Sequence, residues 1–262
     1  MSYPPTVSLL NESIEQEIRK KLIDHFTRFY GERVESHVNA LLSLESHKGR
    51  FKYLQNKIGA QVFSSQQSIL ISGFSVGSEM IAAKQFGFGE IFGVEVSAFY
   101  QEMCQKRVGY ISGLHPQLYD GSLLPYENDQ FAVVASSHVI EHTQSPELYI
   151  QECMRVLMPE GYLLLEFPHR YHPIELHTGL LSFEWLPRPI RNMVLTILSG
   201  RFFPLEKGKK KLYNHILITN LQQISMARIE RVLKRMAMPY SVVDKRESKP
   251  GVIRCIIKKR CR

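Results

Sequence analysis

The chain has 262 residues, of which 44% are hydrophobic and 22% are charged, a composition typical of an ordinary globular protein. Lysine and arginine outnumber aspartate and glutamate by 33 to 25, which gives a net charge of +8. No stretch approaches the roughly 18 consecutive apolar residues of a membrane span, and the first residues lack the pattern of a signal peptide. We therefore expect a cytoplasmic protein.

Part of the positive charge is concentrated in two clusters, at residues 207–211 and 258–262. Such clusters can contact nucleic acid, anionic lipid or a phosphorylated substrate, but a solvated loop and a basic tail are the more common cases. The four cysteines show no CxxC spacing, so we expect free thiols and no metal site at Cys104, Cys153, Cys255 and Cys261.

The first 60 residues are expected to be helical. Apolar residues recur at helical spacing from Ile14 to Phe29, and Gly31 is a typical residue for a helix end. Further helices are expected at residues 34–42 and 50–58. No strand pattern occurs in this region, so we interpret residues 1–60 as an N-terminal helical cap.

From residue 68 onward, short apolar runs alternate with helical patterns. Strands are expected at residues 68–75, 91–96, 117–119, 131–136 and 161–167, with helices between them. This alternation predicts a doubly wound α/β fold with a parallel sheet and helices on both faces. The core is expected to span residues 61–168.

Residues 169–223 break this alternation, because they contain four prolines and the single tryptophan. We interpret them as an insertion after the fifth strand. A last helix at about 225–235 and two closing strands, at 240–245 and 252–258, are expected to complete the core from residue 224 to residue 262.

Small and acidic residues occur where three of the expected strands end. The first strand is followed by Gly73-Phe74-Ser75-Val76-Gly77 and then by a helix, an arrangement that lets a ligand approach the backbone closely. Glu95 ends the next strand and can bind ribose hydroxyls, while Asp120-Gly121 follows the third and can hold the edge of an adenine. Each feature alone can arise from packing; together they predict one ligand crevice.

Residues 119–168 read YDGSLLPYENDQFAVVASSHVIEHTQSPELYIQECMRVLMPEGYLLLEFP. This segment resembles the class I S-adenosylmethionine-dependent methyltransferases, in particular the branch that includes the ubiquinone- and menaquinone-biosynthesis-like enzymes. Four motifs of that family correspond to residues 120–125, 131–134, 139–142 and 152–161. The resemblance implies a Rossmann-like, mostly parallel seven-stranded sheet with an antiparallel last strand.

The resemblance also implies S-adenosylmethionine as cofactor and a set of residues around it. The glycine-rich loop would lie under the methionine moiety, Glu95 would bind the ribose, and Asp120 and Gly121 would hold the adenine. The cofactor-binding residues expected on this basis are Gly73, Ser75, Gly77, Glu95, Val96, Asp120, Gly121, Ser137 and His138.

The sequence departs from the family pattern at four positions. The family usually has an acidic residue where this chain has Ile71, and a glycine where it has Ser75. Ala132 replaces an aspartate, and Glu160 replaces one glycine of a Pro-Gly-Gly motif. Loss of the acid at position 71 removes a common anchor for the methionine end of the cofactor, so that affinity is lowered or another group compensates. The departures also leave open a catalytically degenerate binding or scaffold protein.

Methyl transfer needs a base only if the acceptor must lose a proton. The candidates are His142, after the fourth strand, and His169 and His172, at the start of the insertion. A helix-entry role for His142 and surface positions for the other two are alternatives.

We expect a small-molecule, glycan or lipid-type acceptor, methylated at oxygen, with the insertion and the N-terminal helices covering the crevice. A nucleic-acid methyltransferase is the alternative suggested by the basic clusters. It is less favoured because residues 136–139 read SSHV, where base-modifying enzymes usually carry an Asn/Asp-Pro-Pro-Tyr-like motif. The sequence leaves the oligomeric state open.

Overall fold

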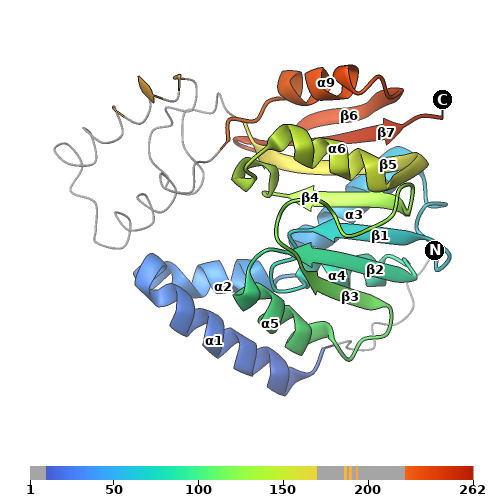
Figure 1. Ribbon diagram of the computed structural model, residues 1–262. Helices are drawn as coiled ribbons and strands as arrows, with labels where there is room; N and C mark the ends of the chain where they lie inside the picture. Colours follow the sequence, from blue (N-terminus) through green and yellow to red (C-terminus); the bar gives the residue numbers. More distant parts are fainter. Residues whose placement is uncertain (1–9, 170–185, 188, 191–192, 194–221, 262) are drawn as a thin grey trace.

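A computed structural model of the chain describes residues 10–169, 186–187, 189–190, 193 and 222–261 (Figure 1). Most of the predicted insertion at 169–223 lies outside the described residues, and so do His172 and the basic cluster at 207–211. Within the described ranges, no helix is long and apolar enough to cross a membrane.

The described chain forms one seven-stranded sheet. Its strands are β1 (Ser68–Ser72), β2 (Glu90–Glu95), β3 (Leu114–Leu118), β4 (Phe131–Ser137), β5 (Leu157–Pro168), β6 (Tyr240–Lys249) and β7 (Val252–Lys259). Their order is β3-β2-β1-β4-β5-β7-β6, and β7 runs antiparallel to both of its neighbours. The first five strands are parallel to one another. The predicted fold class is thus confirmed, including the antiparallel last strand.

Helices cover both faces of this sheet (Figure 1). They are α1 (Glu12–Tyr30), α2 (Val34–Leu42), α3 (Glu45–Ile58), α4 (Ser78–Gln85), α5 (Ala98–Val108), α6 (Pro146–Val156) and α9 (Met226–Arg235), with short 3-10 helices η1 (Gly31–Arg33) and η2 (Ile140–His142). Because strand side chains alternate between faces, Leu70 packs into the core under α6 and α9, whereas Ile69 and Ile71 pack into the core under α3 and α4.

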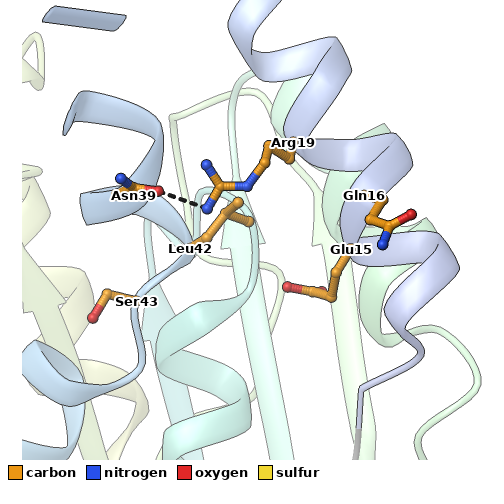
Figure 2. Close-up of a pocket in the computed structure, with 6 residues that line it drawn as sticks. All are labelled: Glu15, Gln16, Arg19, Asn39, Leu42 and Ser43. Carbon is orange, nitrogen blue, oxygen red and sulfur yellow. Dashed lines mark hydrogen bonds between the residues drawn. The ribbon is translucent and has the colours of Figure 1, made fainter. Parts of the chain in front are cut away.

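The first two helices pack on each other and on α5, apart from the main sheet cores. Ile18, Leu22 and Val38 form a cluster there with Val76 and Met103. A cavity of about 310 Å³ lies between α1 and α2. Figure 2 shows Arg19 reaching across it to Asn39, at a nitrogen–oxygen distance of 2.6 Å.

Arg107 of α5 ties these helices to the loop after β1. Its side chain is fully buried. The guanidinium donates hydrogen bonds to both carboxylate oxygens of Glu15, to the carbonyls of Val76 and Leu42, and to the hydroxyl of Ser78. One side chain therefore fixes α1, α2 and the start of α4 against each other.

Candidate functional site

The loop between β1 and α4 has the left-handed backbone that small residues permit. Gly73, Ser75 and Gly77 have φ angles of 75°, 52° and 82°. A Cβ atom at Gly73 would collide with a methyl group of Val139, from the segment after β4. The loop therefore lies closely against Val139, directly after the end of β4, and Gly73 and Ser75 line a cavity there.

Glu95 joins this loop to the end of β2. One carboxylate oxygen accepts a hydrogen bond from the Ser75 amide at 3.0 Å. The other accepts from the amides of Val96 and Ser97, at 2.9 and 3.1 Å. The side chain is only 9% exposed. The structure thus brings together two sequence-predicted features, the glycine-rich loop and the acid after the second strand.

Val96 and the Asp120-Gly121 turn lie side by side at the ends of β2 and β3. A Cβ atom at Gly121 would be 3.2 Å from a Val96 methyl group, and Val96 is 59% exposed. The Asp120 carboxylate accepts hydrogen bonds from the amide and hydroxyl of Ser122, and these bonds lower its pKa. An exposed apolar side chain beside an ordered carboxylate is suited to the flat face and polar edge of a purine.

Ser137 and His138 stand at the end of β4, next to the loop after β1. His138 has a left-handed backbone, with φ of 55°, and its amide donates to the Glu166 carbonyl at 2.8 Å. Its Nδ1 atom lies 3.3 Å from a carboxylate oxygen of Glu141, whose side chain is 3% exposed. The imidazole therefore lies beside a buried carboxylate, neither oxygen of which has a hydrogen-bond partner among the described residues.

A cavity of about 520 Å³ opens beside the loop after β1 and the end of β4, and Glu95, Val96 and the Asp120-Gly121 turn are not among the described residues that line it. The loop after β1 and the end of β4 form one wall, through Gly73, Ser75, Ser137 and His138. Helices α2, α3 and α4 and the ends of β5, β6 and β7 form the rest, with charged side chains from Arg50, Glu79, Glu166, Lys249 and Arg254.

Buried ion pairs between arginine and glutamate line this cavity, and Arg50 lies within 4.0 Å of Glu166 as well as near Glu79. Arg50 is 3.1 Å from Glu79, and Arg254 is 3.0 Å from Glu166. Burial raises the pKa of Glu79. Burial also acts to raise the pKa of Glu166, but Arg50 and Arg254 outweigh it and hold that pKa below 4.5.

His47, which accepts a hydrogen bond from Arg50, is neutral at physiological pH because burial and that guanidinium lower its pKa to about 3. The cluster of charged side chains at this cavity, Arg50, Glu79, Glu166 and Arg254, was not predicted from the sequence. Its one visible signal was Glu166, an acid within an otherwise apolar strand pattern.

The three predicted catalytic histidines remain untested predictions. His142 lies in η2 with an exposed side chain and is not among the described residues that line the cavity. His169 follows β5, is half-buried, and donates from its amide to the Gly251 carbonyl. His172 lies outside the described residues.

Comparison with known proteins identifies the kind of domain. Residues 70–165 match the methyltransferase domain family. A methyltransferase from Mesorhizobium loti that depends on S-adenosylmethionine is 12% identical, with a TM-score of 0.58 over 83% of this chain and 100% of that one. One from Aquifex aeolicus is 9% identical, with a TM-score of 0.53 over 94% and 98% of the two chains.

A third match, from the complex between the Haloferax volcanii Trm112 methyltransferase activator and a methyltransferase, is 12% identical, with a TM-score of 0.58 over 96% and 99% of the chains. At these identities the likeness shows the fold. No curated protein matches the sequence.

Residues 70–165 are therefore similar to the methyltransferase domain family, and the fold of the chain is that of S-adenosylmethionine-dependent methyltransferases. The solved structures that share this fold include methyltransferases that depend on S-adenosylmethionine. The residues at the crevice suit S-adenosylmethionine, because a buried carboxylate, Glu95, stands at the end of β2 and an apolar side chain, Val96, is exposed beside the Asp120 turn.

Proposed function

We propose that this protein methylates a small-molecule, glycan or lipid-type acceptor at an oxygen atom, and that it belongs to the branch of the ubiquinone- and menaquinone-biosynthesis-like enzymes. The branch assignment is supported by the motifs at 120–125, 139–142 and 152–161. The observation that supports the proposed activity is the cavity lined by Gly73, Ser75 and His138, since an imidazole beside the glycine-rich loop can serve as a base.

Bound S-adenosylmethionine supplies an electrophilic methyl group on its sulfonium, and the protein supplies alignment. We propose that Glu95 holds the ribose and that Val96 and the Asp120-Gly121 turn hold the adenine. A carboxylate offers about four acceptor sites, and Glu95 uses three of them for backbone amides. One site remains, on the oxygen facing Ser75, so we expect one direct ribose hydrogen bond to this side chain.

An oxygen acceptor is supported by the pairing of His138 with Glu141. A hydroxyl must lose its proton during methylation. With Nδ1 of His138 turned toward the buried Glu141 carboxylate, Nε2 is the nitrogen left to accept that proton. We therefore place His138 first among the candidate bases, with His142, His169 and His172 as the alternatives from the sequence.

A nucleic-acid acceptor receives no support from the basic cluster at the end of β7. Lys258 and Arg260 form ion pairs with Glu160, and Lys259 forms one with Asp129. Because β7 is antiparallel to β5, its last residues lie beside the start of β5, at the sheet edge opposite the crevice. These charges are therefore paired within the chain and distant from the methyl-transfer site.

The test is transfer of a tritiated methyl group from S-adenosylmethionine to separated lysate fractions containing lipid, polysaccharide, RNA or small molecules. We expect label in a non-RNA fraction, and a loss of that label with His138→Ala. Label in the RNA fraction alone would contradict the proposed acceptor class. Undiminished transfer by His138→Ala would exclude this residue as the base.

A further inference from the structure

The position that usually anchors the methionine end of the cofactor is apolar in this chain. Ile71 is fully buried and packs in the core between the sheet and helices α3 and α4. It offers neither a charge nor a hydrogen bond to a ligand. Any group that holds the amino-acid end of the cofactor must therefore come from elsewhere in the crevice.

Arg50 and Glu79 lie elsewhere in the crevice, beside the loop after β1. They come from α3 and α4, and both line the cavity together with Gly73 and Ser75 of the loop after β1. Their side chains are only 7% and 5% exposed, and they face each other at 3.1 Å. The pair is thus positioned beside the loop that underlies the methionine moiety.

Each member of the pair has a buried polar atom without a hydrogen-bond partner. Nε of Arg50 has a proton to donate, and Oε1 of Glu79 can accept one, but neither is satisfied. Buried polar groups are rarely left in this state unless a ligand, ion or water satisfies them. The neighbouring pair differs, because Arg254 directs both Nε and Nη2 toward one oxygen of Glu166 at 3.0 Å.

We propose that Arg50 and Glu79 bind the amino-acid end of S-adenosylmethionine, Arg50 donating to the α-carboxylate and Glu79 accepting from the α-ammonium group. This inference rests on the proposed function. One donor and one acceptor of opposite charge match a zwitterion, whereas a purely anionic ligand would be repelled by Glu79 and a purely cationic one by Arg50. The pair takes over the task of the acid that is missing at position 71.

Two product-like ligands separate the amino-acid end from the rest of the cofactor. S-adenosylhomocysteine carries the amino acid, and 5′-methylthioadenosine carries the same adenosine and thioether without it. The wild type should bind S-adenosylhomocysteine more tightly in a calorimetric titration. Arg50→Gln and Glu79→Gln should each weaken its binding by about tenfold or more, the loss expected for a hydrogen bond to a charged group, and leave 5′-methylthioadenosine nearly unchanged.

Controls separate this effect from a general loss of structure. Lys57→Gln alters another cation of α3, one that pairs with Asp244 on β6 and does not line the cavity, so both affinities should stay at the wild-type level. The double variant Arg50→Gln with Glu79→Gln removes both charges of the pair and leaves neither unpaired. It replaces the single variants in the titration if one of them fails to fold. It too should lose only the preference for the amino-acid ligand.

The ratio of the affinities for S-adenosylhomocysteine and 5′-methylthioadenosine tests whether the pair binds the amino-acid end of the cofactor. An unchanged ratio in the double variant, whether both ligands bind as before or both bind more weakly, would overturn the inference and assign the pair to the fold or to the acceptor. A wild type that binds neither ligand would instead contradict the proposed function.

Discussion

Replacing Arg107 with methionine tests how the N-terminal helices are held to the cofactor loop. Methionine keeps an unbranched side chain of similar reach but removes every donor. The guanidinium makes five hydrogen bonds, two of them to the Glu15 carboxylate at 2.6 and 3.0 Å. The others go to Val76, Ser78 and Leu42. The variant leaves all of these acceptors without their donor.

The magnitude follows from the burial of each acceptor. Removing one partner of a buried ion pair typically costs about 3–5 kcal/mol. Here the Glu15 side chain is 24% exposed, so water can partly solvate its carboxylate after the change. The Val76 and Leu42 carbonyls lose a donor, at about 1 kcal/mol or more each. We therefore expect Arg107→Met to lower the free energy of unfolding by about 3 kcal/mol.

Urea denaturation followed by circular dichroism measures this loss. Glu15→Gln is the matched comparison, because it keeps the shape of the partner and removes only its charge; it leaves the buried guanidinium without its counter-charge and should cost about 2–3 kcal/mol. Because Arg107 also holds Val76 in the cofactor loop, the folded Arg107→Met protein should bind S-adenosylhomocysteine more weakly. A loss below about 1 kcal/mol for Arg107→Met would show that the helices are held by the apolar cluster alone.

Three further changes test the site. Glu95→Gln places an amide NH₂ against backbone donors, so the free energy of unfolding should fall by about 1–3 kcal/mol and S-adenosylhomocysteine affinity should fall with it. Gly73→Ala, at a φ of 75° and against Val139, should cost at least about 1–2 kcal/mol and weaken ligand binding. Burial raises the pKa of Glu79, so its ionisation opposes folding as pH rises above 4.5. Glu79→Gln leaves Arg50 without this partner at every pH, but the difference in free energy of unfolding between the variant and the wild type should shift in favour of the variant as pH rises over that range. The charged or titratable groups around Glu79 are His47, Arg50, His138, Glu166 and Arg254.

Each of these three has a clear contrary result. Unchanged calorimetric affinity in Glu95→Gln would mean that the carboxylate serves only the loop. Normal binding by Gly73→Ala would show that the loop has room for a side chain. A pH-independent difference between wild type and Glu79→Gln, measured by urea denaturation from pH 4 to pH 8, would show that the buried carboxyl group does not titrate there.

The sheet could be predicted because its signal is local. Buried strands appear as short apolar runs, and two of the crossover helices begin after a serine that caps them, Ser97 before α5 and Ser145 before α6. The weakest prediction was the third strand, placed at 117–119, whereas β3 spans Leu114–Leu118. Three of its five residues are exposed, so no apolar run marked it.

The start of β5 was also predicted late, at residue 161, whereas β5 begins at Leu157. Its pairing with β4 shifts register between Leu157 and Tyr162, and Glu160 within that shift has a φ of 64°. The family's glycine at this position is explained by that left-handed backbone. Glu160 is held there by Lys258 and by the Cys261 amide, which lower its pKa to about 2.

Only part of the candidate site could be predicted from the sequence. The glycine-rich loop, Glu95 and the Asp120 turn each follow one of three successive strands. Their spacing along the chain could therefore be recognised in the sequence. The cluster of Arg50, Glu79, Glu166 and Arg254 instead depends on how α3 packs across the sheet against β7. That packing joins segments from opposite ends of the chain, and no local pattern encodes it.

A calorimetric titration of the wild-type protein with S-adenosylhomocysteine tests the central claim most directly. The cofactor crevice formed by the loop after β1, Glu95 and Val96 predicts saturable binding at one site per chain. Folded protein that shows no binding up to millimolar ligand would contradict the assignment of this crevice to S-adenosylmethionine.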